Sequence, residues 1–234
     1  MRCTVCEAEN DRFATVCIRC GGFLQNRISN LDLFDTVWRV LENPNAAFRM
    51  IAISEHKNYS IFLYSLFGVC MALTDFWFFR AGERFESMLT LLGWSVAIGV
   101  PLGLVLCPTV SCIHWLVTFL LGGRSGFRNS VGMTSYALTP IILSRVLIFP
   151  IELLTFGMYL FTWNPSPMTL KPALFLAFLS IDALLTLWSL ILMISGTRIS
   201  AQVNAGKSIV AAIAVFGVIG TVLTAGGGQL LKFL

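Results

Sequence analysis

The stretch that decides the fold is 122–152, which reads GGRSGFRNSVGMTSYALTPIILSRVLIFPIE. A glycine pair and a short basic loop lead into an apolar segment, 135–161. About 20 apolar residues are enough for a helix to cross a bilayer, so this segment is long enough to span it. Arg145 and Glu152 lie seven positions apart and share one face of a helix. Charges at that depth are costly unless they face protein or water, so we expect this face to point into a helix bundle.

The composition of the chain is that of an integral membrane protein. Of its 234 residues, 56% are hydrophobic and only 12% are charged, and the mean hydropathy is +0.80. A soluble domain carries about 25% charged residues. The net charge of +4 is spread over the loops, which is typical of balance at a membrane surface and argues against nucleic-acid binding. The lipid bilayer is therefore the first expected partner.

Four cysteines near the N-terminus form two CxxC pairs separated by ten residues: Cys3, Cys6, Cys17 and Cys20. Two such knuckles supply four thiolates that can close tetrahedrally on one zinc ion. The alternatives are two disulfides or a redox-active pair, but redox chemistry needs only one CxxC and disulfides need an oxidising compartment. We predict a structural zinc ribbon over 1–24, folded by its metal, with no coordination position left for catalysis.

Residues 25–59 are predicted to form an amphipathic helical linker between ribbon and membrane domain. A first helix is expected after Asn30 or Asp32 and a stop at Asn43-Pro44, followed by a second helix over 45–54. The apolar positions are Leu31, Phe34, Val37, Trp38 and Leu41 in the first helix, and Phe48, Ile51 and Ala52 in the second. Either both helices lie in the membrane interface, with Trp38, Arg39 and Arg49 at headgroup level, or they pack against the ribbon or the loops.

Five apolar segments predict an all-α membrane protein, a five-span helix bundle over 60–234. The segments are 60–79, 88–121, 135–161, 172–195 and 208–231. The second segment is interrupted by Pro101 and Pro108. It is either one tilted, kinked helix or a span to about Cys107 followed by an amphipathic piece, 111–121.

Prolines and glycines within these segments predict kinks and close contacts. The third span is expected to kink near Pro140 and Pro150. The small residues Gly99 and Gly103, or Gly217 and Gly220, are expected to allow helices to approach closely.

Cysteine chemistry and, more weakly, charge indicate the topology. A thiolate zinc site belongs in a reducing compartment, so we expect the N-terminus to be cytoplasmic. Five spans then place the loops 122–134 and 196–207 inside. These loops carry Arg124, Arg128, Arg198 and Lys207, against Arg80, Arg84, Lys171 and Lys232 outside, a slight positive-inside bias.

Three stretches resemble the Yip family (Ypt-interacting proteins). GGRSGFRNSVGMTSYALTP resembles that family's loop and helix start, carried here by Gly122, Gly123, Arg124, Phe127, Tyr136 and Pro140. LWSLILMISGTRISAQVNAGKSIVAA resembles its fourth span, loop and fifth-span start, and NPNAAFRMI fits its pre-membrane segment. The resemblance covers about 31–231 and implies five spans with a cytoplasmic N-terminus.

The same resemblance bears on function. Eukaryotic Yip proteins are linked to vesicle trafficking and to small GTPases of the Rab class. The added ribbon looks more like prokaryotic members, whose role is not established, so GTPase binding is not carried over and a bacterial inner membrane is the expected location.

Four ionisable residues lie in or near the spans: Asp75, Arg145, Glu152 and Asp182. In the functional interpretation they form a proton or ion relay, or a polar substrate site. In the structural interpretation Arg145 pairs with Asp182 or Glu152 and fixes helix register, while Asp75 reaches the interface. No transporter repeat is visible, which favours the structural interpretation.

No motif in the sequence indicates an enzyme. HExxH, GxSxG and Walker loops are absent, and the two histidines, His56 and His114, have no catalytic pattern around them. We predict a non-enzymatic membrane scaffold or adaptor that recruits a protein partner through the ribbon and cytoplasmic loops, with homo-oligomerisation left open. The alternative is a small transporter or channel subunit that uses the buried charges of spans three and four.

Overall fold

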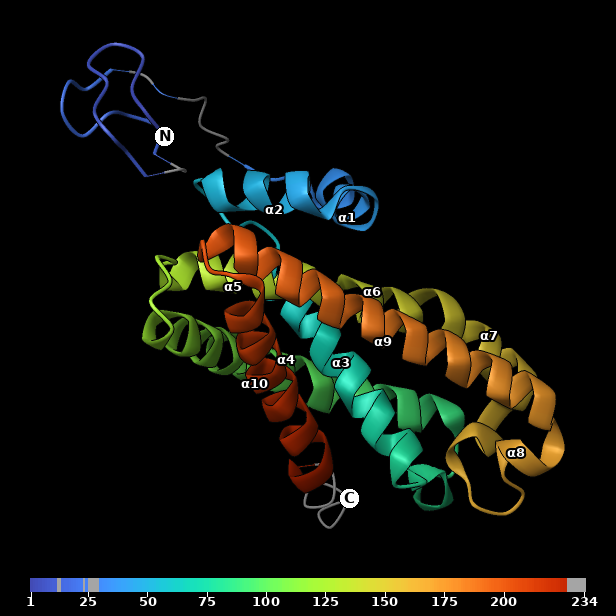
Figure 1. The fold of residues 1–234 in the computed structure, drawn as a ribbon. Coiled ribbons are helices and arrows are strands. Elements are labelled where there is room, and N and C mark those ends of the chain that lie inside the picture. The colour runs from blue at the N-terminus through green and yellow to red at the C-terminus, as the bar shows by residue number, and fades with distance from the viewer. Residues whose placement is uncertain (12–13, 23, 25–29, 227–234) are drawn as a thin grey trace.

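The computed structural model describes residues 1–11, 14–22, 24 and 30–226. Within these ranges the regular elements are helices, and the N-terminal ribbon contains a bridge between Arg2 and Glu9 (Figure 1). Five helical segments are long and apolar enough to cross a membrane: 60–78, 88–120, 127–161, 172–200 and 205–225. The prediction of an all-α, five-span membrane protein is confirmed.

The helices follow one another with short connections. The first half contains α1 (Leu33–Glu42), α2 (Pro44–Ile53), α3 (Ser60–Phe78), the short 3₁₀ turn η1 (Ala81–Arg84) and α4 (Met88–Leu120). The third span consists of α5 (Phe127–Ala137), α6 (Thr139–Leu143), η2 (Ser144–Ile148), α7 (Phe149–Phe156) and η3 (Gly157–Phe161). The second half ends with α8 (Pro167–Leu170), α9 (Pro172–Ser200), α10 (Ala205–Thr221) and η4 (Val222–Gly226).

Two predicted boundaries were wrong in the same way. The third span begins at Phe127 rather than at residue 135, and α9 continues to Ser200 rather than ending at residue 195. Both missed pieces are polar in sequence but helical in the structure. Of the two alternatives for 88–121, the single helix is correct: α4 runs unbroken over 33 residues, Pro101 and Pro108 included.

The third span is irregular where the sequence contains proline. One helix ends at Ala137 and the next begins at Thr139, with Pro140 in its first turn, as predicted for a kink there. A π turn, η2, then precedes Phe149-Pro150. A π turn widens the helix by one residue and re-aims its side chains. Arg145 lies within this turn.

Helices α3 and α4 are in backbone contact through glycines. A Cβ added at Gly68 would lie 2.1 Å from the Gly99 carbonyl oxygen and 2.3 Å from the Gly103 nitrogen. The prediction for Gly99 and Gly103 is therefore confirmed. Gly217 and Gly220 differ, because nothing lies within 4 Å of a Cβ built on either. Those two glycines face outward from α10.

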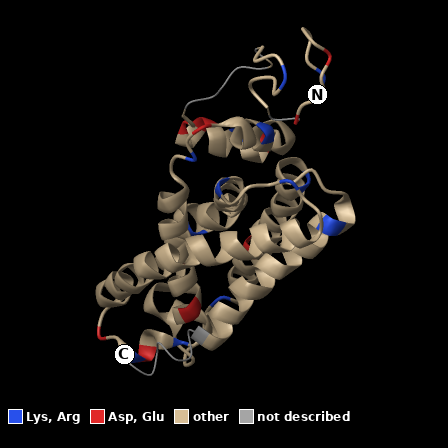
Figure 2. Cartoon of the chain, turned by 90° about the vertical axis from the view of Figure 1, so that its left-hand side faces the viewer, with Lys and Arg blue, Asp and Glu red and all other residues tan. Residues whose placement is uncertain are grey.

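The linker helices form a separate layer at one end of the bundle (Figures 1 and 2). Asp32 caps α1 by accepting a hydrogen bond from the Asp35 N–H, and Asn43 caps α2 in the same way. Phe48 and Ile51 of α2 are buried in the main core. On α1, however, Phe34 is 83% exposed and Trp38 is 66% exposed, so these two aromatic residues face away from the core of the bundle.

Lys57 joins this layer to the bundle. Its ammonium donates hydrogen bonds to the carbonyls of Ile51 and Ser54, the latter at 2.9 Å, at the C-terminal end of α2. Cations there also interact favourably with the helix dipole. Its side chain packs under α5, since a Cβ added at Gly132 would lie 3.0 Å from the Lys57 Cδ. Burial, with a smaller contribution from the Arg128 charge, lowers the pKa of Lys57 to about 8.

Lys57→Met is expected to loosen α2 from the bundle. The variant keeps an apolar stem but loses hydrogen bonds made by a charged donor, each worth roughly 2 kcal/mol. Amide hydrogen exchange over 44–53 should accelerate while exchange in α4 stays unchanged. Lys171→Met, an exposed lysine at the start of α9, is the control and should leave both regions as they are. Unchanged protection of α2 in the Lys57 variant would show that the capping contacts contribute nothing.

Candidate metal centre and intramembrane charge cluster

The four N-terminal cysteines converge on one point. Their sulfur atoms all lie within 4.8 Å of one another. The Cys3 and Cys20 sulfurs are 3.6 Å apart, as are those of Cys6 and Cys17. A tetrahedral zinc site with Zn–S bonds of about 2.3 Å requires neighbouring sulfurs about 3.8 Å apart. All seven cysteines of the chain are free thiols, so the structure forms neither of the two disulfides considered from the sequence.

Backbone N–H groups of the two knuckles point at the sulfurs. Val5 and Arg19 each donate to the first cysteine of their own pair, Cys3 and Cys17, at 3.4 Å. The N–H groups of Cys20 and Arg19 lower the pKa of the Cys17 thiol to about 6. Such donors stabilise thiolate, the form that binds metal.

Asn10 is a supporting residue that sequence reasoning missed. Its side-chain amide donates to the Ala8 carbonyl at 2.8 Å and to the Cys17 sulfur at 3.5 Å, and its oxygen accepts the Ile18 N–H at 2.8 Å. It therefore links both knuckles around one ligand. No spacing rule in the sequence singles out such a residue, because its role depends on the folded turn.

The arrangement fits a metal ion. It offers four convergent soft donors, three of which accept backbone N–H hydrogen bonds, and a buried amide that supports them, which is the donor set zinc prefers in structural sites. These cysteines could hold the ion and would leave it no open position. Zinc itself stays a prediction.

Replacing both cysteines of the second knuckle should remove the metal. Cys17→Ser/Cys20→Ser leaves two thiolates, and zinc content measured by plasma mass spectrometry should fall from about one ion per chain to near zero. Cys112→Ser is the matched control, since Cys112 is exposed on α4, outside the cluster. Equal zinc in the double variant and the control would contradict the assignment of these ligands.

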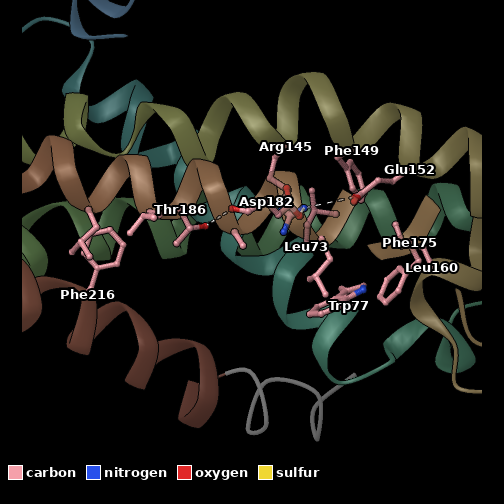
Figure 3. Close-up of a pocket in the computed structure, with 14 residues that line it drawn as sticks. Leu73, Trp77, Arg145, Phe149, Glu152, Leu160, Phe175, Asp182, Thr186 and Phe216 are labelled. Atoms are coloured by element: carbon pink, nitrogen blue, oxygen red, sulfur yellow. Dashed lines mark hydrogen bonds and ion pairs between the residues drawn. The ribbon is translucent and has the colours of Figure 1, made fainter. Parts of the chain in front are cut away.

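Three of the four intramembrane charges meet in the bundle (Figure 3). Arg145 Nη1 lies 2.8 Å from Asp182 Oδ2 and 3.7 Å from Glu152 Oε2. The Ser144 hydroxyl also donates to Asp182, and Arg145 Nη2 lies 3.4 Å from the Thr74 hydroxyl. The pairing of Arg145 with acids from its own span and from α9 is as the structural interpretation expected. Ser144 and Thr74 were not anticipated.

Asp75 is not part of this group. It is 4% exposed, so it is buried in the protein rather than reaching the interface as expected. Within the described part of the chain its Oδ1 has no hydrogen-bond partner, and no ion pair includes it. The four charges therefore do not form one continuous relay.

The loop after α4, residues 122–124, is a turn held by hydrogen bonds. Gly122 adopts φ +79°, a conformation that L side chains rarely adopt. The Gly123 N–H donates to the Thr118 carbonyl at 2.8 Å, and the Arg124 N–H donates to the Ala201 carbonyl at 3.0 Å. The Lys207 ammonium, on α10, donates a hydrogen bond to the Leu121 carbonyl at 2.6 Å.

The other three residues of the family-like stretch lie in helices of the third span. Phe127 begins α5, Pro140 lies in the first turn of α6, and Tyr136 is fully buried with its hydroxyl donating to the Asn58 carbonyl at 3.1 Å. The two stretches that suggested a family therefore meet in space, one around residue 123 and the other around residue 201.

A family model described as the Yip1 domain matches residues 38–226. The chain belongs to the Yip1 family. The match begins at Trp38, inside the segment that the sequence suggested as a linker, so α2 and the second half of α1 fall within the Yip1 domain and the cysteine ribbon lies outside it. Searches of curated proteins and of solved structures returned no match.

Proposed function

We propose that this Yip1-domain protein is a non-enzymatic membrane scaffold that recruits a protein partner through its zinc ribbon and the neighbouring loops. The observation that carries the proposal is where the ribbon sits. Asp11 of the ribbon accepts hydrogen bonds from Gln202, at 3.2 and 3.3 Å, in the loop between α9 and α10. That loop is bonded to the turn after α4, so ribbon and loops offer one joint surface.

The character of this surface supports a protein partner. Val5 and Ile18, at the tips of the two knuckles, are 74% and 83% exposed. Contiguous exposed apolar patches mark contact surfaces, and we infer that these two side chains belong to one. Arg124, Arg128 and Lys207 add positive charge on the adjoining loop and helix starts, where Figure 2 shows basic segments. A partner with an apolar patch and acidic rim would complement both.

The orientation belongs to the same proposal. Thiolate ligands require a reducing compartment, and the loops beside the ribbon are basic, as cytoplasmic loops are. We therefore place the N-terminus in the cytoplasm and the protein in a bacterial inner membrane. The outward-facing Phe34 and Trp38 of α1 are suited to the headgroup region or to the partner.

Affinity purification in mild detergent tests the scaffold. Wild type, Cys17→Ser/Cys20→Ser and Cys112→Ser are compared for zinc and for co-purifying proteins. We expect wild type and the Cys112 control to retain one defined partner, and the double variant to lose it while the membrane domain stays folded. If wild type contains zinc but no protein co-purifies with it, the proposal is overturned. The ribbon would then only stabilise the N-terminal end of the bundle.

The alternative, a transporter or channel subunit, predicts a different result. Flux in liposomes should disappear in Glu152→Gln or Asp182→Asn although zinc and fold are kept. A scaffold predicts that binding of the partner survives both substitutions.

A further inference from the structure

A cavity of about 490 Å³ lies beside the charge cluster, between α3, the third span, α9 and α10 (Figure 3). Arg145, Glu152 and Asp182 all line it, and most of the remaining wall is apolar. A pocket of this size can enclose a small organic molecule. The kind of ligand that it can bind follows from the charged groups and the aromatic rings that line it.

One of the two carboxylates lacks a hydrogen-bond donor from the described residues. Asp182 accepts a hydrogen bond from the Arg145 guanidinium at 2.8 Å and another from the Ser144 hydroxyl. Glu152 Oε2 lies 3.7 Å from the same guanidinium nitrogen, beyond hydrogen-bond distance, and no hydrogen bond from the described residues reaches its side chain. Yet the Glu152 side chain is only 9% exposed. One cation faces two acids, so with both acids ionised the cluster carries a net negative charge beside the cavity.

Aromatic rings line the same cavity. Trp77 and Phe175 have ring centroids 6.5 Å apart, and Phe149 and Phe216 complete the aromatic lining. The faces of such rings attract cations, more strongly when water is absent. The guanidinium of Arg80 lies 5.3 Å from the Trp77 ring centroid and 5.2 Å from that of Trp163, and Arg80 is not among the lining residues.

The cavity reaches the exposed side of α9. Two of its lining residues, Leu179 and Leu187, are 41% and 53% exposed. Because α9 is a membrane-spanning helix with an apolar exterior, a ligand entering there must first dissolve in the bilayer. This requires an apolar body around any charge that the ligand carries.

We propose that this cavity binds a lipophilic organic cation, an amine or quaternary ammonium with an apolar body, whose charge is met by Glu152. The ligand's apolar groups lie against Trp77 and Phe175. This inference goes beyond the scaffold function and does not depend on it, because it concerns binding within the bilayer and leaves the ribbon untouched.

Two ions of equal shape and opposite charge provide the test. Tetraphenylphosphonium and tetraphenylborate are titrated onto the full chain in phosphatidylcholine nanodiscs, with empty nanodiscs as the baseline. We expect saturable binding of the phosphonium near one per chain and none of the borate above baseline. Glu152→Gln should weaken phosphonium binding by about tenfold or more, as loss of a buried charge partner would. Glu86→Gln, an exposed acid in the loop before α4, should bind like wild type.

Two further variants keep the proposal testable if Glu152→Gln misfolds. Glu152→Asp retains the charge and should retain the preference for phosphonium over borate. Ala183→Trp fills the cavity from α9 without removing any charge and should abolish binding. Equal binding of both ions, or phosphonium binding that survives Ala183→Trp in folded protein, would overturn the proposal.

Discussion

Gly68→Leu is expected to abolish the folded protein. The α3 and α4 backbones meet at this glycine, and the first side-chain atom would already lie 2.1 Å from the Gly99 carbonyl oxygen. Ordinary overpacking costs about 1–3 kcal/mol because side chains can shift. Here the obstacle is backbone in a helix that continues over 33 residues, so the two helices must separate. Loss of the monodisperse peak in detergent size-exclusion chromatography is the expected readout.

The chain offers a matched control for this substitution. Gly217 is also a helical glycine in a span, but nothing lies within 4 Å of a Cβ built there. Gly217→Leu should elute and melt like wild type, or slightly above it, because leucine has the better helix propensity. If both variants behaved alike, the close approach of α3 and α4 would not be a requirement of the fold.

These glycines also show where sequence reasoning stops. The pairs 99/103 and 217/220 are equally small and equally placed within apolar segments, yet only the first meets another backbone. Helical spacing tells which residues share a face, but which face meets a neighbour depends on how the whole bundle packs. Phe34 and Trp38 illustrate the same limit, since their spacing predicts a common face and not its outward direction.

The ends of the spans were missed for a related reason. Thr134 lies in a polar stretch that reads as loop, but the Tyr64 hydroxyl lies 2.7 Å from its side-chain oxygen inside the bundle. Thr197, in the predicted loop after the fourth span, is 3.0 Å from His114 Nε2. Hydropathy counts such residues as polar, whereas partners far along the chain satisfy them. The cysteine cluster was easier to predict because its ligands lie close together in sequence.

Arg145→Met is expected to destabilise the bundle by about 3–5 kcal/mol, the cost of leaving a buried ion pair without one partner. Asp182 would keep only its Ser144 contact, and Glu152 would lose its nearest cation. Unfolding in mixed micelles of rising SDS fraction measures the change. Arg198→Met, an exposed arginine near the end of α9, is the control and should shift stability by less than about 0.5 kcal/mol.

The double variant Arg145→Met/Asp182→Met separates pairing from any other role of the arginine. Removing both charges leaves no uncompensated ion at this contact, so the double variant should recover most of the stability lost by Arg145→Met alone. Such a recovery would mean that the 2.8 Å pair fixes helix register and that Glu152 is the one charge left free for a ligand. If the double variant were as unstable as the single one, Glu152 would be the acid that depends on Arg145, and the surplus carboxylate beside the cavity would instead be that of Asp182.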